Sequence, residues 1–315
     1  MSDYTFSRIN AGNFSDLVQL MDTVNETPAD VVRLRQKYDT AKFGAQDLGY
    51  LAYKNGDSVA AAYYGVFPLR LSLNGEVILA AQSGDTMTHP LHRGKGLFIE
   101  LAKKTYALAK AEGVKFVFGF PNSNSYPGFV KKLGWKHPYN MISLNIFSAT
   151  LPLNLLAKKI PFVARLQEKW LNTLLQLFFK KNELYPGPYS SVTSSGAAGV
   201  LRNHAFLDYK KNCGQSFQSG QAFFFVKYDG DINIGDVVDL GNGTDARRMI
   251  RKLRWVAAFS GIARTKTFCS PESKLASILA DCSLRRDSLA YGYVPFDEIP
   301  GLDKIQFTYI DYDTF

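Results

Sequence analysis

The 315-residue sequence predicts an α+β protein of two domains, each with a mixed, mostly antiparallel sheet flanked by helices. The chain is longer than the ~100–200 residues of a usual single domain. Its first half joins alternating strand patterns to a strand–loop–helix–strand unit, and its second half repeats these motifs in the same order. We therefore expect a first domain over residues 1–147, a helical connector over 148–190 and a second domain over 191–315.

The composition indicates a folded protein that binds anions. Hydrophobic residues make up 46% of the chain and aromatic residues 14%, which is enough apolar area for packed cores. The net charge of +9 is spread along the chain, which favours an anionic small ligand over nucleic acid. Cys213, Cys269 and Cys282 follow no disulfide or metal spacing, and no signal sequence begins the chain, so we expect a cytoplasmic protein.

Two helices and a meander of strands are expected in the amino-terminal part. Asn13 precedes apolar residues at helical spacing, and a second helix is expected over 29–38. Asn55-Gly56 and Asn74-Gly75 are strong hairpin signals. The antiparallel strands are expected over 49–53, 58–67 and 69–81.

A basic glycine loop follows the meander. Residues 93–96 read Arg-Gly-Lys-Gly, and an amphipathic helix begins near Leu97. The glycines permit positive φ and close backbone approach, while the helix directs the positive end of its dipole at the same point. The two basic side chains add full charges, and an apolar strand over 114–120 completes the unit. This arrangement predicts a phosphate-binding site.

The residues after this unit complete a set of ordered motifs. They read Pro121-Asn-Ser-Asn-Ser-Tyr126 and then Lys132-Leu-Gly-Trp135, ahead of a last strand over 140–147. Together with Pro90-Leu-His-Arg-Gly-Lys-Gly96, they resemble the core of the GCN5-related N-acetyltransferase (GNAT) superfamily over residues 49–147. The resemblance implies an N-acetyltransferase that uses acetyl-CoA and no metal. The sequence departs from the family pattern at two positions. One is Leu91, and the other is Val130, where many members have a tyrosine.

The resemblance also implies where coenzyme A binds. The strand before the glycine loop would part from the next strand and use its freed backbone groups to hold the pantetheine. Gly84 fits a bulge that opens such a gap. The implied coenzyme-binding residues are Thr86, Met87, Thr88, Arg93, Gly94, Lys95, Gly96, Leu97, Asn122 and Asn124.

Three residues are candidates for proton transfer. Asp85 is either a general base or a hydrogen-bonded structural carboxylate, and Tyr126 is either the acid for the departing thiolate or a loop aromatic. The α-carboxylate of Phe315 is a second candidate base, because the chain resembles the multidomain aminoglycoside-modifying acetyltransferases associated with enhanced intracellular survival. Alternatively, Phe315 fills a core and water removes the proton. His89 and His92 flank the loop at a spacing that does not predict a metal site.

The second half echoes the first without the basic loop. Residues 223–231 repeat the pattern of 49–57, and Ile234-Gly-Asp-Val-Val238 repeats Ser83-Gly-Asp-Thr-Met87. A helix over 245–261, a strand over 264–268 and a helix over 273–281 are expected to follow, with no counterpart of the first domain's hairpin. Gly241-Asn-Gly-Thr244 lacks a basic residue, so we expect a degenerate GNAT-like domain.

The connector has two interpretations. Residues 151–156 and 163–181 are rich in Leu and Phe with interspersed Lys and Arg, typical either of a helix on a membrane surface or of a helix packed between domains. No apolar run reaches the ~20 residues that span a bilayer. Residues 185–191 are expected to mark the following domain boundary.

The leading hypothesis is an acyl-CoA-dependent N-acyltransferase that acetylates a primary amine of a small molecule such as an amino sugar, polyamine, aminoglycoside or peptide. One alternative is an aminoacyl-tRNA-dependent transferase, which the sequence pI of 9.3 would suit. The other is a sensor that binds acetyl-CoA without turnover, which Val130 leaves open.

Overall fold

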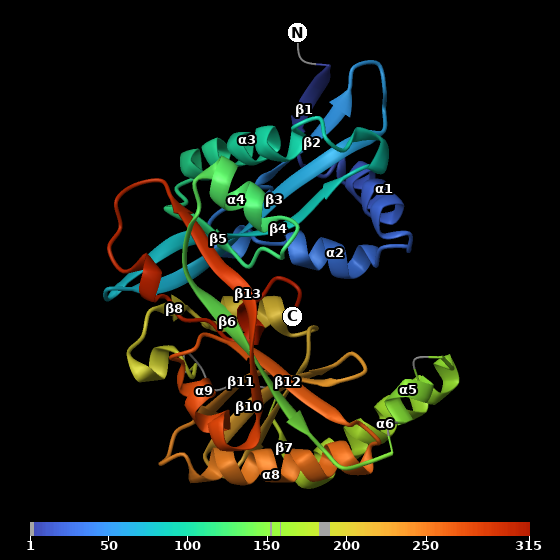
Figure 1. Ribbon diagram of the computed structural model, residues 1–315, viewed down its shortest axis with the longest axis vertical. Helices are drawn as coiled ribbons and strands as arrows, with labels where there is room; N and C mark the ends of the chain where they lie inside the picture. Colours follow the sequence, from blue (N-terminus) through green and yellow to red (C-terminus); the bar gives the residue numbers. More distant parts are fainter. Residues whose placement is uncertain (1–2, 152, 158, 183–189) are drawn as a thin grey trace. The chain divides into compact units, whose positions relative to one another are not determined.

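The computed structural model describes residues 3–151, 153–157, 159–182 and 190–315 (Figure 1). It divides into two compact units. The first unit comprises Met1–Tyr139 with Leu289–Asp303, and the second comprises Asn140–Ser288 with Lys304–Phe315. Each unit has a mostly antiparallel sheet flanked by helices, so the predicted α+β class is confirmed.

The first unit has the sheet order β1-β2-β3-β4-β5-β13, in which only the β4–β5 pair is parallel among the pairs described. Its two expected amino-terminal helices are confirmed as α1 and α2. The elements are β1 (Tyr4–Arg8), α1 (Phe14–Asn25), α2 (Val31–Tyr38), η1 (Ala41–Phe43), β2 (Gly49–Lys54), β3 (Ala60–Leu73), β4 (Glu76–Thr88), η2 (Pro90–His92), α3 (Leu97–Ala111), β5 (Phe116–Gly119) and α4 (Tyr126–Leu133).

The structure confirms one sequence prediction for the meander and corrects another. The hairpin at Asn74-Gly75 is confirmed, since both residues have positive φ, as a tight turn between β3 and β4 requires. The expected break between strands at Pro68 is wrong, because β3 continues through it to Leu73. Strand β1 was not expected, and it adds to the sheet edge beside β2.

Alternation along β3 separates the two cores of the first unit. Tyr63 faces one core with α1 and α2, whereas Tyr64 faces the other core with α3 and Trp135. Successive strand residues point to opposite faces, so one strand supports both helix layers. Helices α2 and α3 therefore lie on opposite faces of the same strands.

The second unit has the sheet order β6-β12-β11-β10-β9-β7. Its parallel pair is β11–β12, which corresponds to β4–β5. The elements are β6 (Lys136–Phe147), α5 (Leu153–Ala157), α6 (Pro161–Phe178), β7 (Lys180–Lys181), η3 (Thr193–Ser195), β8 (Gly199–Val200), α7 (His204–Lys210), β9 (Gln215–Ser219), β10 (Ala222–Tyr228), β11 (Ile232–Asp239), α8 (Thr244–Phe259), β12 (Arg264–Cys269), α9 (Lys274–Leu279), η4 (Ala280–Cys282), β13 (Leu284–Pro295), η5 (Leu302–Lys304) and η6 (Tyr309–Asp311).

The units do not follow the contiguous ranges 1–147 and 191–315. Strand β6 pairs with β12 in the second unit, and the end of β13 pairs with β5 in the first. Trp135 explains why β13 fits there: a Cβ on Gly119 of β5 or on Gly292 of β13 would lie 3.2 and 3.0 Å from its ring. Both strands therefore need glycine where this indole packs, a requirement that only the folded sheet reveals.

The second unit repeats the strand–loop–helix–strand order of the first. Helix α8, strand β12 and helix α9 occur where the sequence predicts them. The expected absence of a hairpin counterpart is wrong, because β9 and β10 form an antiparallel hairpin that turns at Gly220. That this unit is a degenerate copy of the first stays a prediction.

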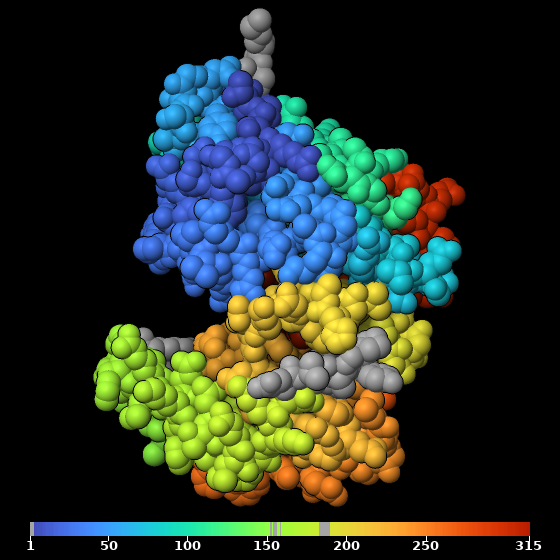
Figure 2. All heavy atoms as spheres, turned by 180° about the vertical axis from the view of Figure 1, so that it is seen from behind, coloured from blue at the N-terminus to red at the C-terminus, as the bar shows by residue number. Residues whose placement is uncertain are grey.

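The predicted connector folds as part of the second unit. Figure 2 shows the yellow-green segment that contains α6 at the surface. Leu171, Leu174 and Leu175 of α6 are buried in the core of the unit, while other apolar residues of α6 are exposed. None of the described helices is long and apolar enough to cross a membrane. Most of the expected boundary at 185–191 lies outside the described residues.

Candidate active site

The glycine loop, residues 93–96, has the conformation that its sequence predicts. Gly94 and Gly96 have φ of 75° and 78°, and a Cβ built on either would meet nothing within 4 Å. Only glycine adopts this backbone without strain. The loop therefore presents bare main chain to open space at the start of α3.

The amides of this loop are available to a ligand. Within the described part of the chain, no acceptor is found for the N–H groups of residues 94–97, whereas the Gly96 carbonyl accepts from Ile99 and Glu100 inside the helix. The side chains of Arg93 and Lys95 are exposed, and that of Leu97 is buried in the core. Unpaired N–H groups, the helix dipole and two cations together suit a diphosphate.

The two histidines beside the loop have structural contacts. The His92 ring lies edge-on to Tyr4 and its Nδ1 is 2.9 Å from the tyrosine Oη, while the His89 side chain accepts from the Leu91 N–H. Burial, with smaller contributions from His89 and nearby lysines, lowers the pKa of His92, which keeps this ring neutral at pH 7. Among the described residues, no cluster of three metal-ligating side chains exists.

Strand β4 carries the predicted bulge. Gly65 of β3 pairs with Gly84, but Tyr63 pairs with Met87, so β4 has one extra residue here. At the bulge, Asp85 adopts a left-handed backbone conformation with a φ of 47°. Such a conformation is uncommon for a residue with a side chain, and strain of this kind concentrates at functional sites.

Strands β4 and β5 part just before the bulge. Their pairing ends at Gln82–Phe118, and β5 itself ends at Gly119, whereas β4 continues to Thr88. Along this extension Met87 and Thr88 pair with β3 on the other side, so their main chain toward β5 has no strand partner. A ligand in extended conformation can occupy the position of the missing strand.

Asp85 is held by two donors from the end of α2. Lys37 Nζ lies 2.7 Å from its Oδ1, and Tyr38 Oη donates to its Oδ2 at 3.1 Å. The aspartate side chain is 11% exposed, so it remains reachable from solvent. The sequence predicted the helix, but nothing in its pattern indicated that Lys37 and Tyr38 reach a carboxylate nearly fifty residues away.

Tyr38 acts as a fixed donor to this carboxylate. Burial raises the pKa of the Tyr38 hydroxyl well above its ordinary value, and the neighbouring Tyr63 and Asp85 raise it further. The phenol therefore stays protonated at every physiological pH. The Lys37 ammonium also lies 4.7 Å from the centre of the Phe67 ring, which fixes its position over Asp85.

Tyr126 begins α4 and has a partner that the sequence did not indicate. Its Oη is 2.8 Å from His137 Nδ1, and His137 Nε2 is 3.1 Å from the Tyr139 carbonyl. A carbonyl only accepts, so Nε2 carries the proton and Nδ1 accepts from the tyrosine. Val130, at the departure from the family pattern, packs against the core.

The two asparagines have different environments. Asn122 Oδ1 accepts from the N–H groups of Asn124 and Ser125, so its side chain shapes the turn into α4. The Asn124 side chain is exposed. Whether either residue contacts coenzyme A stays a prediction.

Phe315 belongs to the second unit. Its ring is 1% exposed and packs against Phe225, Tyr309 and the backbone of Gly235. This packing matches the alternative in which the side chain fills a core. A role of its carboxylate in catalysis stays a prediction.

One family model matches most of the first unit. Residues 5–137 match the family model of the acetyltransferase (GNAT) domain. No protein of curated function matches the chain in sequence.

Solved structures share the fold along nearly the whole chain. A putative acetyltransferase from Pyrococcus horikoshii has a TM-score of 0.59 at 11% identity, over 98% of this chain and 94% of its own. A probable N-acyltransferase from Enterococcus faecalis V583 has a TM-score of 0.61 at 13% identity, over 96% and 75%. A GCN5-related N-acetyltransferase from Kribbella flavida has 0.56 at 12% identity, over 94% and 71%.

Proposed function

Because residues 5–137 form a GNAT acetyltransferase domain, we propose that the first unit transfers an acetyl group from acetyl-CoA to a primary amine of a small molecule such as an amino sugar. One observation carries the proposal. The open glycine loop, with amides that lack an acceptor in the described chain, lies directly after a strand that has parted from its parallel neighbour. A diphosphate and an extended pantetheine need these two features in this order.

The residues of the chain divide the binding of coenzyme A between them. The N–H groups of residues 94–97 hold the pyrophosphate, and Arg93 and Lys95 neutralise its charge. The unpaired edge at Thr86–Thr88 holds the pantetheine and donates to the acetyl carbonyl. Acetyl-CoA supplies the acetyl thioester, and the amine nitrogen forms the new bond as the carbon–sulfur bond breaks.

Asp85 is the proposed acceptor of the amine proton, directly or through water. Its carboxylate binds one ammonium group, that of Lys37, in the present structure. An incoming substrate ammonium meets the same carboxylate, which positions the nitrogen and then takes its proton. Tyr126 is the proposed donor to the thiolate. Its hydroxyl proton, which points to His137 Nδ1 in the present structure, turns to the sulfur when the carbon–sulfur bond breaks.

The test is release of free thiol from acetyl-CoA in the presence of a panel of amino sugars, polyamines, aminoglycosides and peptides. We expect one class to be turned over. Asp85→Asn should reduce kcat by about 10²-fold or more, because a positioned base contributes ~10²–10⁴. Asp287→Asn, at an exposed position of β13, is the matched control and should leave kcat unchanged.

Two outcomes would contradict the proposal. Tight binding of acetyl-CoA with no thiol release for any amine would instead indicate a sensor. Near-normal kcat in Asp85→Asn, with an unchanged pH profile, would exclude Asp85 as the base.

A further inference from the structure

The second unit carries an apolar face whose side chains stay exposed within the part of the chain that the structure describes. It is formed by α6 and the end of α8 and is called the α6–α8 face below. Its members are Phe162, Leu166 and Trp170 of α6 and Trp255 and Phe259 of α8, with exposed fractions of 72%, 58%, 50%, 61% and 59%. Soluble proteins rarely expose so many large apolar side chains together, and such patches mark interaction sites.

The orientation of α6 is fixed, so this exposure is built into the fold. Gln167 is buried and donates to the Ser260 carbonyl at 2.8 Å, while its Oε1 accepts from Tyr228. Trp170 Nε1 donates to the Phe259 carbonyl at 3.0 Å. Together with the buried leucines of α6, these bonds prevent the helix from rotating its apolar strip inward.

The aromatic members adjoin one another. The rings of Trp255 and Phe259 stack with centroids 5.8 Å apart, and the indole N–H of Trp170 reaches the main chain of Phe259. Residues 162, 166 and 170 are four apart, so they lie along one side of α6. Two exposed indoles beside phenylalanine and leucine are the side chains that sit at a membrane–water interface.

Helices α6 and α8 carry an excess of basic residues. Helix α6 has Arg165 and Lys169 with one acidic residue, Glu168, whereas α8 has five basic residues and one acidic residue, Asp245. The basic residues of α8 are Arg247, Arg248, Lys252, Arg251 and Arg254. This excess of positive charge is complementary to anionic lipid headgroups and not to a second copy of the same basic surface.

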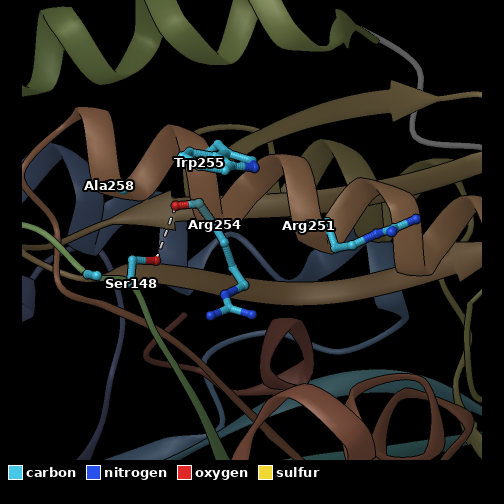
Figure 3. A pocket seen from close by; sticks show the side chains of 6 residues that line it. Ser148, Arg251, Arg254, Trp255 and Ala258 are labelled. Atoms are coloured by element: carbon cyan, nitrogen blue, oxygen red, sulfur yellow. Dashed lines mark hydrogen bonds between the residues drawn. The ribbon is translucent and has the colours of Figure 1, made fainter.

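A hollow beside Trp255 can hold a headgroup. It has a volume of about 340 Å³ and is lined by Ser148, Ala149, Arg251, Arg254, Trp255 and Ala258. In Figure 3, Trp255 and Arg254 point to different sides of α8, and Ser148 donates to the Arg254 carbonyl at the wall of the hollow. The volume falls within the ~300–1,000 Å³ of small-molecule sites.

We propose that the α6–α8 face binds the surface of an anionic lipid bilayer, with its aromatic residues in the headgroup region and Arg251, one turn before Trp255, near the lipid phosphates. This binding does not depend on the acetyltransferase site of the first unit. Between the two interpretations of the connector, the proposal selects the membrane-surface helix, with one side of α6 packed on protein and the adjoining side left for lipid.

The test is partitioning of the full chain onto vesicles at physiological salt. We expect co-sedimentation with phosphatidylcholine vesicles that contain phosphatidylserine, little with phosphatidylcholine alone, and loss at high salt. Arg251→Glu should weaken partitioning more than tenfold, because each charge near an anionic surface contributes about fivefold. Phe162→Ser should weaken it about tenfold through lost apolar burial. The matched controls Lys304→Glu and Val77→Ser alter exposed residues elsewhere and should bind normally.

Tryptophan fluorescence provides a second readout. Trp170 and Trp255 lie on the face, whereas Trp135 is buried in the first unit, so a vesicle-dependent blue shift reports on the face alone. The shift should diminish in Trp255→Phe. Equal sedimentation of wild type and Arg251→Glu, or a blue shift that grows with protein concentration without vesicles, would overturn the proposal; the latter would indicate a second copy of the chain as the occupant.

Discussion

The bulge of the first unit and that of the second hold the same residue types in opposite environments. Asp85 is reached by Lys37 and Tyr38 and keeps contact with solvent. Its counterpart Asp236 also follows a glycine at a bulge beside a parallel strand pair, yet it is fully buried against Arg202 and Ser191. One carboxylate remains available to a ligand, and the other has become part of a core.

The loops that precede α3 and α8 also differ in whether their amides are free to bind a ligand. In the first unit the loop amides have no acceptor within the described chain, whereas in the second Asp239 accepts from the N–H groups of Gly241 and Ala246, both at 2.8 Å. Asp239 comes three residues after Asp236, as Thr88 comes three residues after Asp85, so the two occupy equivalent positions. The second unit thus supplies its own anion to the helix start, which satisfies the amides and repels a phosphate.

The core behind the second bulge is closed by aromatic packing. The ring of Phe315 lies against Gly235, and a Cβ there would approach it to 2.9 Å. Arg202 donates to Asp311 through two nitrogens and to Thr308 as well. The same order of elements therefore leaves an open site in one unit and a filled core in the other, because buried side chains occupy that space in the second unit.

The largest difference between equivalent substitutions in the two units is expected in the affinity for coenzyme A. Gly96→Glu places a carboxylate at the start of α3 and should weaken coenzyme A binding by on the order of 10³-fold, which is about 4 kcal/mol. Gly243→Glu is the matched control, since Gly243 also precedes a helix at positive φ with nothing within 4 Å. Titration calorimetry should show normal affinity for the control. Equal affinity in both variants would contradict the assignment of the loop.

The next effect is on stability. Arg202→Met leaves Asp236 and Asp311 buried without their cation, so it should lower the free energy of unfolding by about 3–5 kcal/mol. Lys37→Met removes a cation from the partly exposed Asp85 and should cost about 1 kcal/mol. Urea unfolding at neutral pH measures both. A loss in Arg202→Met no larger than that in Lys37→Met would show that the second bulge is not a charged core.

The pH dependence of the unfolding free energy gives a second test of the charged core around Arg202. Burial raises the native pKa of Asp311 above its ordinary 3.8, despite the opposing effect of Arg202. The native state therefore holds this proton more tightly than the unfolded chain, and the group favours folding at low pH and less so as pH rises through its native pKa. Without Arg202 the native pKa rises further, so the stability lost in Arg202→Met should shrink as the pH is lowered from about 7 to about 4.

The smallest effect is expected at Tyr126. Tyr126→Phe should lower kcat by about tenfold, less than the usual ~10² for a general acid, because a thiolate with a pKa near ~8.5 leaves without full protonation. The loss should be greatest on the alkaline side of the pH–rate profile. Tyr139→Phe keeps the carbonyl that orients His137 and should leave the profile unchanged. An unaltered profile in Tyr126→Phe would exclude this hydroxyl as the acid.

The sequence by itself determined the features that depend on neighbouring residues. The turn at Asn74-Gly75 and the open loop at residues 93–96 rest on a positive φ that glycine or asparagine permits, and Gly84 predicted the bulge that follows it. The helix after the loop follows from apolar residues at helical spacing. Local rules therefore located the phosphate-binding loop, and the resemblance to the GNAT superfamily assigned it to coenzyme A.

Only the tertiary structure decided which distant residues meet. Lys37 at the end of α2 reaches Asp85 in β4, and Arg202 reaches Asp311. Strand β13 lies beside β5, where Gly119 and Gly292 make room for Trp135. The periodicity of the sequence likewise does not indicate that β6 pairs with β12 or that the end of β13 pairs with β5. Hydrophobic patterns state which side of an element is buried, but the partner that buries it is selected by packing and hydrogen bonding over the whole chain.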